Sequence, residues 1–500
     1  MVLGLFGGRT PDHPLATERS AQQALAELPK TNPEKALEDV HDWIVSVAAT
    51  EELKPERRAE IYLLLDETAV PFHRKLTRDY VADANLPRSQ EARLRRVVSE
   101  FWKELAGAYI ACVEQCAADS SLAGRLKARW PLLCVRALRA LAGQLKWHYM
   151  RNEPEGADLW QAVGKVCRFA EEKKVFAEMI PFLPGGQQTS SAERELMKLL
   201  MLAGSSPDSL SPHSLELADW IVAHVSGGFV FSATHQPQVT YNYIALGSGT
   251  PPQRLIQMPP ASPDLRFFAP GNASGELDKI IRIVETGAPP SGLNLGGAYE
   301  TTTVLDVCLR LKSAWASPPP VRKHERYPVS HNLNVATGFA TVLARLQGEE
   351  AAAGTEKWVT ENISAGGVGA VVSNVQGDGP QVGKLLALSV AGGSGNYSVG
   401  VIRRWNRRPR MQSGVSIRTF AKAAFPVRFG GITPQDAILL ADDRNLGEEV
   451  LVCLCAGGYD RRVPPVFDFD GQKILLTPVG IVESGDDYEI ARYKVMRSSD

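Results

Sequence analysis

The chain has 500 residues, of which 44% are apolar and 22% charged, values that fit several packed domains and exclude a wholly disordered protein. Its 55 basic and 56 acidic residues give a net charge of -1, which excludes a polyanion binder that relies on the charge of the whole chain. No apolar run approaches the roughly 18 residues that span a bilayer. The apolar stretch Val2–Phe6 is too short for a signal peptide, so we expect a cytoplasmic protein.

The seven cysteines are odd in number and show no spacing typical of a disulfide framework. Cys112 and Cys116 lie four residues apart in a helical pattern, and Cys453 and Cys455 lie two apart in a strand pattern, so each pair shares one face. Neither pair has the nearby Cys or His residues that would complete a metal site. We therefore expect all four to be buried free thiols, with no metal and no cofactor.

Helical patterns follow one another from about residue 16 to residue 225. Apolar residues recur at the spacing of one helix face, and Asn32 before Pro33 is typical of a helix start. The predicted helices begin at Pro33, at Pro55 (ending near Ala69), at Pro71, after Ser89, at Pro131, after a capping box at Ser190–Glu193, and at Pro212 (ending at Val225). No repeat period is evident, so we predict an all-α bundle or array over residues 1–225.

A small α/β region is predicted over residues 226–316. Gly227 and Gly228 end the helical pattern, after which strands are predicted at 229–231 and 240–246 and helices at 276–285 and 302–315. The run Ser317-Pro318-Pro319-Pro320 then predicts a stiff extended linker.

Strand patterns fill the rest of the chain. Short apolar segments separated by Gly-rich turns are typical of a small closed β-barrel, which we predict over residues 317–425. Its strands are predicted at 333–343, 368–372, 382–390, 397–405 and 414–420. Further strands at 437–441, 449–455, 473–479 and 488–495, the third after a hairpin turn at Asp470-Gly471, predict an additional β module over residues 426–500.

Two short motifs lie at the start of the predicted barrel. Arg322 and Arg326 are four residues apart directly after the proline linker, and Asn362, Ser364 and Gly367 form the pattern N-x-S-x-x-G. In this order they resemble the two signatures of the PilZ domain, R-x-x-x-R and [D/N]-x-S-x-x-G. The resemblance covers about residues 320–422, including the strand patterns at 397–405 and 414–417, and it implies a six-stranded β-barrel.

The chain departs from the commonest PilZ pattern in two respects. Asn362 replaces the more frequent Asp, which keeps a hydrogen-bond acceptor and drops a charge. Arg326 and Asn362 are 36 positions apart, and we expect an enlarged hairpin loop near Gln347–Gly354 to account for that spacing.

PilZ domains bind cyclic di-GMP, so the resemblance implies a bacterial receptor for this second messenger. Arginine pairs bidentately with phosphate and with guanine O6 and N7, and it stacks on purines, which fits Arg322 and Arg326. Asn362 and Ser364 would hydrogen-bond guanine edges, and Gly367 would let the backbone approach the base. The dinucleotide would be a ligand and not a cofactor.

Five arginines lie between residues 403 and 410. Arg404, at the end of a predicted barrel strand, is a candidate further contact for the ligand, whereas Arg407 to Arg410 fit a solvated hairpin tip. The alternative is a nucleic-acid patch that uses Trp405 as a stacking platform.

The chain contains no GxSxG, Walker A, HExxH, GGDEF or EAL motif, so we expect no enzymatic activity. We expect a multidomain cyclic di-GMP receptor that relays binding to the helical domain or to a protein partner through linked equilibria. Two alternatives remain: a scaffold whose PilZ barrel binds no ligand, and a nucleic-acid-binding regulator that uses the 403–410 arginines. The output pathway is not evident from the sequence.

Overall fold

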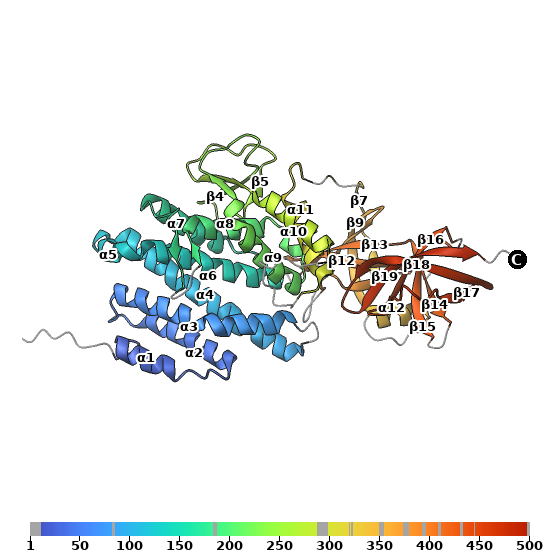
Figure 1. Ribbon diagram of the computed structural model, residues 1–500, viewed down its shortest axis with the longest axis horizontal. Coiled ribbons are helices and arrows are strands. Elements are labelled where there is room, and N and C mark those ends of the chain that lie inside the picture. The colour runs from blue at the N-terminus through green and yellow to red at the C-terminus, as the bar shows by residue number, and fades with distance from the viewer. Residues whose placement is uncertain are drawn as a thin grey trace, which may run out of the picture. The chain divides into compact units, whose positions relative to one another are not determined.

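The computed structural model describes residues 12–82, 86–183, 188–287, 299–319, 321, 324–349, 355–373, 380–392, 397–408, 412–430, 434–444 and 446–497. The chain divides into two compact units. The first comprises Met1–Pro207 and Pro212–Pro320, and the second comprises Asp208–Ser211 and Val321–Asp500. Helices dominate the first unit and strands the second, as Figure 1 shows.

Long helices make up most of the first unit, which confirms the predicted helical region. They are α1 (Glu18–Ala26), α2 (Pro33–Ala49), α3 (Pro55–Ala82), α4 (Arg88–Ala118), α5 (Ser120–Leu126), α6 (Trp130–Met150), α7 (Ala157–Glu172), α8 (Ala192–Ala203) and α9 (Pro212–Val225). Short elements connect them: η1 (Lys127–Arg129), β1 (Ile180–Pro181), β2 (Thr189–Ser190), η2 (Pro207–Ser209) and η3 (Ser226–Gly228). Asn32 caps α2 as predicted, because its side chain accepts a hydrogen bond from the Lys35 amide.

Two predicted helix boundaries are wrong. The helix α3 continues through Pro71, where the sequence predicted a break, and Ala69 and Phe72 on either side of it are buried. The free energy gained by burying this helix face outweighs the cost of the backbone hydrogen bond that a proline cannot donate. The cap of α8 is Ser191, which accepts from the Arg194 amide, whereas the predicted Ser190 donates its hydroxyl to Glu195.

A buried charge cluster joins three helices at the centre of the first unit. The fully buried guanidinium of Arg136 on α6 contacts Asp66 at 2.6 Å and Glu67 at 3.0 Å, both on α3. Tyr109 on α4 donates its hydroxyl to Asp66 at 3.0 Å. Buried charges need such partners, so the cluster fixes how α3, α4 and α6 face one another.

The small mixed region predicted after residue 225 belongs to the first unit. Its strands β3 (Val230–Ser232), β4 (Asn242–Ala245), β5 (Gln253–Arg254) and β6 (Leu265–Ala269) form an antiparallel sheet in the order β3-β6-β4-β5, followed by α10 (Ala273–Glu285) and α11 (Thr301–Trp315). Trp315 donates its indole N–H to Ser205 at 2.9 Å. A Cβ on Gly164 of α7 would lie 1.8 Å from the Leu246 carbonyl oxygen, so this glycine is what lets the segment after β4 approach the helix.

The second unit begins with a closed six-stranded barrel, as predicted. Its six strands are β8 (Asn332–Thr337), β9 (Thr355–Ser364), β10 (Gly367–Ser373), β11 (Leu385–Val390), β12 (Ser398–Arg408) and β13 (Gln412–Thr419), with α12 (Phe339–Leu346) between β8 and β9. The two-residue strand β7 (Tyr327–Pro328) precedes them and pairs with the end of β9. The strand order is β10-β13-β12-β11-β8-β9, and β9 pairs again with β10 to close the barrel. Trp358 and Trp405 fill the interior with aliphatic side chains from the other strands.

The helix α12 corrects one predicted strand. The predicted strand 333–343 ends at Thr337, and Phe339–Leu346 is helical instead. Phe339 and Val342 then lie on one buried helix face, a spacing that suits a helix as well as an apolar strand. This helix lies in the long connection between the antiparallel strands β8 and β9, and it contributes to the spacing between Arg326 and Asn362. The enlarged loop predicted near Gln347–Gly354 falls mostly on residues 350–354, which lie outside the described residues.

A second six-stranded barrel follows and is almost closed. Its strands are β14 (Ala423–Phe429), β15 (Gln435–Ala441), β16 (Glu449–Cys455), β17 (Val466–Phe469), β18 (Gln472–Ser484) and β19 (Tyr488–Arg497), in the order β14-β15-β16-β19-β18-β17. Within the described residues, a bridge between Gly430 and Val466 links its two edges. Asp470 and Gly471 have φ values of 50° and 81° and form the predicted hairpin turn. The predicted division into four domains stays a prediction, and its boundary at residue 425 falls within β14.

The two barrels share a hydrophobic core between their outer faces. The first barrel and α12 contribute Phe339, Val342, Leu385, Ala387, Val399 and Val401, and the second contributes Ala424, Ile438, Leu440, Cys453, Tyr488 and Ile490. Cys453 is therefore buried as predicted, but Cys455 at the strand end is exposed, which corrects the prediction for that residue. Cys112 and Cys116 are buried free thiols.

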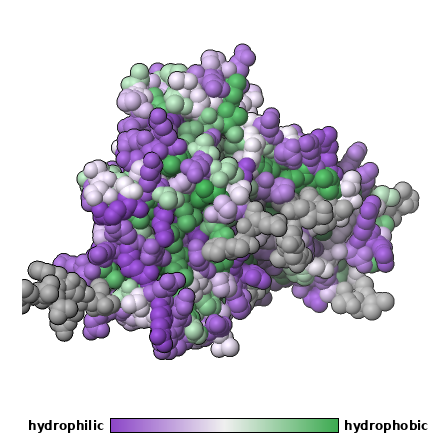
Figure 2. Space-filling model, turned by 60° about the vertical axis from the view of Figure 1, so that its left-hand side comes forward, coloured by the Kyte–Doolittle hydropathy of each residue, from purple (hydrophilic) through white to green (hydrophobic). Residues whose placement is uncertain are grey.

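The face drawn in Figure 2 has hydrophilic side chains over much of its surface, with hydrophobic areas between them. Scattered apolar residues are normal on protein surfaces. Within the described part of the chain, no helix is long and apolar enough to cross a membrane.

Candidate functional site

The N-x-S-x-x-G motif spans the tight hairpin between β9 and β10. Ser364, the last residue of β9, pairs with Gly367, the first residue of β10. The Ser364 hydroxyl donates to the Gly367 carbonyl at 3.2 Å and so holds the turn together. The serine oxygen keeps its lone pairs to accept a hydrogen bond from a ligand N–H.

A β-bulge in β9 decides which way the motif points. Trp358 fills the interior of the barrel, and Thr360 pairs with interior Ala370 and is 4% exposed. The register then shifts, and Asn362 pairs with Gly369. If side chains alternated strictly along β9, Asn362 would point into the barrel, as Trp358 and Thr360 do. The extra residue Glu361 shifts this alternation by one, so Asn362 and Ser364 both point to the outer face.

Gly369 makes room for the side chain of Asn362. A Cβ at Gly369 would lie 2.7 Å from Asn362 Nδ2 and 2.8 Å from its Oδ1. The amide therefore lies directly over the glycine, and no other residue type would leave it in this position.

The structure brings Arg326 beside the second motif. Tyr327 and Pro328 of β7 pair antiparallel with Ile363 and Asn362 of β9. Arg326 directly precedes this pairing and is exposed, so it lies next to the end of β9 that carries the motif. A Cβ on Gly366 would lie 3.2 Å from the His324 ring, which places the preceding segment against the hairpin turn. Arg322 lies outside the described residues.

Strands β13 and β12 extend the same outer face. Ser416 pairs with Gly369, and Arg404 pairs with Ser416, so Asn362, Gly369, Ser416 and Arg404 form one row across four strands. Neighbouring strands lie about 4.8 Å apart, so the row is roughly 15 Å long. A parallel row contains Ser364, Gly367 and Arg418.

We call these rows, together with Arg326, the motif face. Its middle consists of glycine and serine, and its two margins carry the motif side chains and the arginines. Of the predicted site residues, the structure places Arg326, Asn362, Ser364, Gly367 and Arg404 on this one face.

An ion pair holds the bulge in place. Both guanidinium NH groups of Arg408 donate to Glu361, at 2.5 and 3.0 Å. These hydrogen bonds lower the pKa of Glu361 below its usual value. Arg408 was predicted to be a solvated charge, and its carboxylate partner corrects that prediction.

Trp405 is unavailable as a stacking platform. Its ring is 3% exposed and packs among the aliphatic residues inside the first barrel. Arg403 is paired with Glu483 of the second barrel, and the guanidinium of Arg407 lies 5.6 Å from the Trp405 ring centre. The predicted nucleic-acid patch therefore lacks its aromatic platform, and Arg410 lies outside the described residues.

Sequence patterns missed three residues of the motif face: Gly369, Ser416 and Arg418. The spacing of Gly367 and Gly369 was a usable signal, because residues two apart on a strand share a face. Nothing in the sequence fixes the register of β13 against β10, and that register alone brings Ser416 and Arg418 to the motif.

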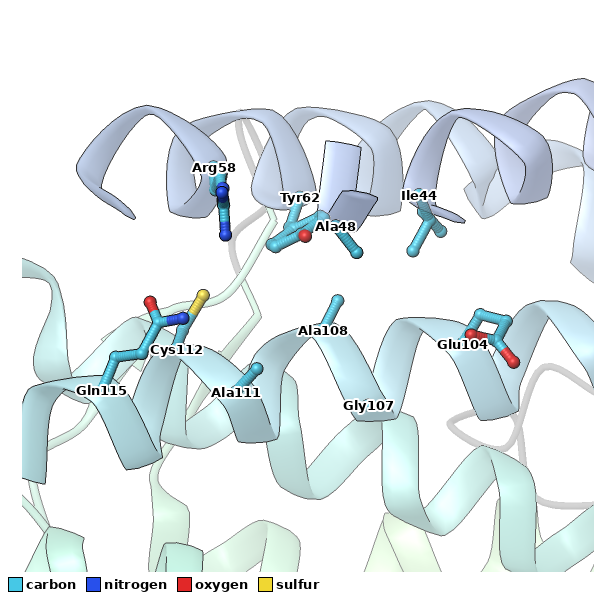
Figure 3. Close-up of a pocket in the computed structure, with 10 residues that line it drawn as sticks. All are labelled: Ile44, Ala48, Arg58, Tyr62, Glu104, Gly107, Ala108, Ala111, Cys112 and Gln115. Carbon is cyan, nitrogen blue, oxygen red and sulfur yellow. The ribbon is translucent and has the colours of Figure 1, made fainter. Parts of the chain in front are cut away.

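A separate small pocket lies in the first unit, between α2 and α3 on one side and α4 on the other (Figure 3). Small residues line its middle, and Arg58, Gln115 and Glu104 stand at its ends. Its volume of about 210 Å³ is below the roughly 300–1,000 Å³ of ordinary ligand pockets, so we assign it no ligand. The described residues contain no group of three or more metal-ligating side chains.

Comparison with known protein families gives a match in the first unit. Residues 19–236 match the family model described as the N-terminal domain of the cyclic-di-GMP receptor FimW. The barrel that carries the motif face gave no match to the PilZ family. Comparisons with curated proteins and with solved structures found no match.

Proposed function

We propose that this protein is a cyclic di-GMP receptor that binds the dinucleotide on the motif face of its first barrel. Two independent lines support the proposal. The helical part resembles the N-terminal domain of a cyclic di-GMP receptor, and the PilZ-like motifs lie in a different part of the chain. The observation that carries most weight is the bulge at Glu361, which turns Asn362 and Ser364 to the same outer face that Arg326 borders.

The chemistry of the face suits a flat, doubly charged dinucleotide. Arg322 and Arg326 would contact phosphates or guanine edges through their planar guanidinium groups. Asn362 offers donors and an acceptor to a guanine edge, and Ser364 offers an acceptor. The glycines at 367 and 369 leave the middle of the face low, so a ring system can lie close to the backbone. Arg404 would reach the ligand from the far end of the row.

The alternatives from the sequence have less support. A barrel that has lost binding would not need to keep a glycine under Asn362 or an ion pair that holds the bulge. A nucleic-acid regulator would need exposed aromatic or unpaired basic side chains, and Trp405, Arg403 and Arg408 are buried or paired. Relay of binding to the helical region or to a protein partner, the absence of enzymatic activity and a cytoplasmic location stay predictions.

Calorimetric titration of the full chain with cyclic di-GMP tests the proposal. We expect saturable binding by the wild-type protein and none detectable for the double variant Arg326→Ala/Asn362→Ala. Asn334→Ala is a matched control, because Asn334 lies on β8 of the same barrel and contacts Lys357 instead of the motif face. No binding by the wild type, or unchanged binding by the double variant, would refute the proposal.

A further inference from the structure

Arg418 lies on the motif face directly opposite the second motif. On β13 it pairs with Gly367, whose other neighbour is Ser364. Val415 and Ile417 point into the barrel, so alternation directs Arg418 outwards. Because Gly367 has no side chain, nothing stands on the sheet between Ser364 and Arg418, about two strand spacings or roughly 10 Å apart.

The guanidinium of Arg418 is held loosely. The side chain is 51% exposed, and the guanidinium lies over the ring of Phe420, 5.0 Å from its centre. Its carboxylate neighbour, Glu483, is 3.7 Å away, beyond hydrogen-bonding distance. Half-exposed pairs of this geometry are weak, so the group is available to a competing anion.

Glu483 belongs to the second barrel and is itself fixed. It lies on β18, is 12% exposed, and also accepts hydrogen bonds from Arg403 and from the Tyr488 hydroxyl at 3.3 Å. The second barrel thus places one carboxylate at the margin of the motif face, next to two arginines of the first barrel. A carboxylate and a phosphate oxygen compete for the same guanidinium donors.

We propose that Arg418 is a phosphate-binding residue of the motif face and that Glu483 is the internal anion that a ligand phosphate displaces from it. The inference rests on the proposed cyclic di-GMP site and adds to it a residue outside both motifs. It follows that the second barrel lowers the affinity of the first for its ligand. Binding in turn removes one contact between the two barrels.

The first experiment is calorimetric titration of full-length variants with cyclic di-GMP. We expect Arg418→Ala to weaken binding by about ten-fold or more, as loss of a charge-assisted contact does. Arg428→Ala removes an exposed arginine of the second barrel, 70% exposed, and should leave affinity unchanged. If Arg418→Ala binds like the wild type while Arg326→Ala/Asn362→Ala does not bind, this inference fails and the proposed function stands. If the wild-type protein does not bind cyclic di-GMP, both this inference and the proposed function are refuted.

The second experiment tests the role of Glu483 by a double-mutant cycle. Glu483→Gln keeps an acceptor for Arg403 but removes the charge, and we expect it to tighten binding several-fold. In an Arg418→Ala background the same substitution should have no effect, because Arg418, the guanidinium for which the carboxylate and the ligand phosphate compete, is then absent. Equal tightening in both backgrounds, or no tightening in a folded Glu483→Gln protein, would overturn the role of Glu483. Thermal unfolding of each variant checks that it is folded.

Discussion

The amide of Asn362 occupies the space that a side chain at Gly369 would need, with Nδ2 only 2.7 Å from the position of a Cβ there. The two residues are opposite each other on β9 and β10. A motif residue and a glycine outside the motif therefore form one structural unit.

Gly369→Ala should displace Asn362 and weaken cyclic di-GMP binding while leaving the barrel folded. The methyl group would overlap the amide, and the amide is the part of the pair that can move. We expect a loss of roughly two- to ten-fold, the value of one neutral hydrogen bond. Gly480→Ala is the control, because a Cβ there meets no atom within 4 Å. Equal affinity for both variants would show that the position of Asn362 does not matter to the ligand.

Arg326→Ala should weaken binding by roughly ten- to 150-fold, which corresponds to the 1.5–3 kcal/mol of a charge-assisted hydrogen bond. We expect the same loss of affinity for Arg322→Ala, because Arg322 is the first arginine of the R-x-x-x-R motif. Lysine should not restore affinity at either position, because it lacks the planar fork that binds phosphate or guanine at two points. Full rescue by lysine in a calorimetric titration would reduce the role of these residues to simple charge.

Glu361→Gln should lower the thermal stability of the second unit in a pH-dependent way. Arg408 lowers the pKa of Glu361, so the ion pair stabilises the fold above the usual glutamate pKa of 4.5 and is lost as the pH falls through the lower folded-state pKa. Because both side chains are partly exposed to solvent, we expect the ion pair to contribute only about 0.2–1 kcal/mol to the free energy of unfolding.

Melting curves of wild type and Glu361→Gln should therefore differ by a few degrees at most at pH 7 and converge well below pH 4.5. Glu449→Gln, which removes a single 3.4 Å contact with Arg492, is the comparison for a simpler surface pair. A difference that persists unchanged at low pH would mean that the charge of Glu361 is not what holds the bulge.

The sequence predicts a helical domain that ends at residue 225, but the structure leads us to expect a longer stable fragment. Trp315 bonds to Ser205, and Arg266 contacts Glu171 at 2.5 Å, so residues after 225 cover α7 and the end of α8. A fragment of residues 1–320 should unfold cooperatively and at a higher temperature than one of residues 1–225. If circular dichroism shows the shorter fragment to be equally stable, the α/β region is an independent addition.

The fold class was predictable because each region has a clear periodicity. Residues of α4 such as Leu94, Val98 and Phe101 follow one helix face, and the strands of both barrels are short apolar runs between turns. Phe339–Leu346 was misassigned because an apolar run of that length suits either a strand or a helix. Its helical state depends on the core that it shares with the second barrel.

The site was predictable only as far as its motifs extend. Arg326, Asn362, Ser364 and Gly367 are recognisable in sequence, but the reason that they share a face is the bulge at Glu361, which depends on strand pairing. Arg418 and Glu483 are 65 positions apart and come from different barrels. Only the packing of one barrel on the other brings them together.

Hydrogen exchange of the full chain with and without saturating cyclic di-GMP tests the central claim most directly, because it locates the ligand. We predict slower exchange in residues 324–330 and 361–369, which border the motif face, and unchanged exchange at the Asp470-Gly471 turn of the second barrel. Binding that leaves residues 324–330 and 361–369 unprotected, or that protects only the helical unit, would contradict it.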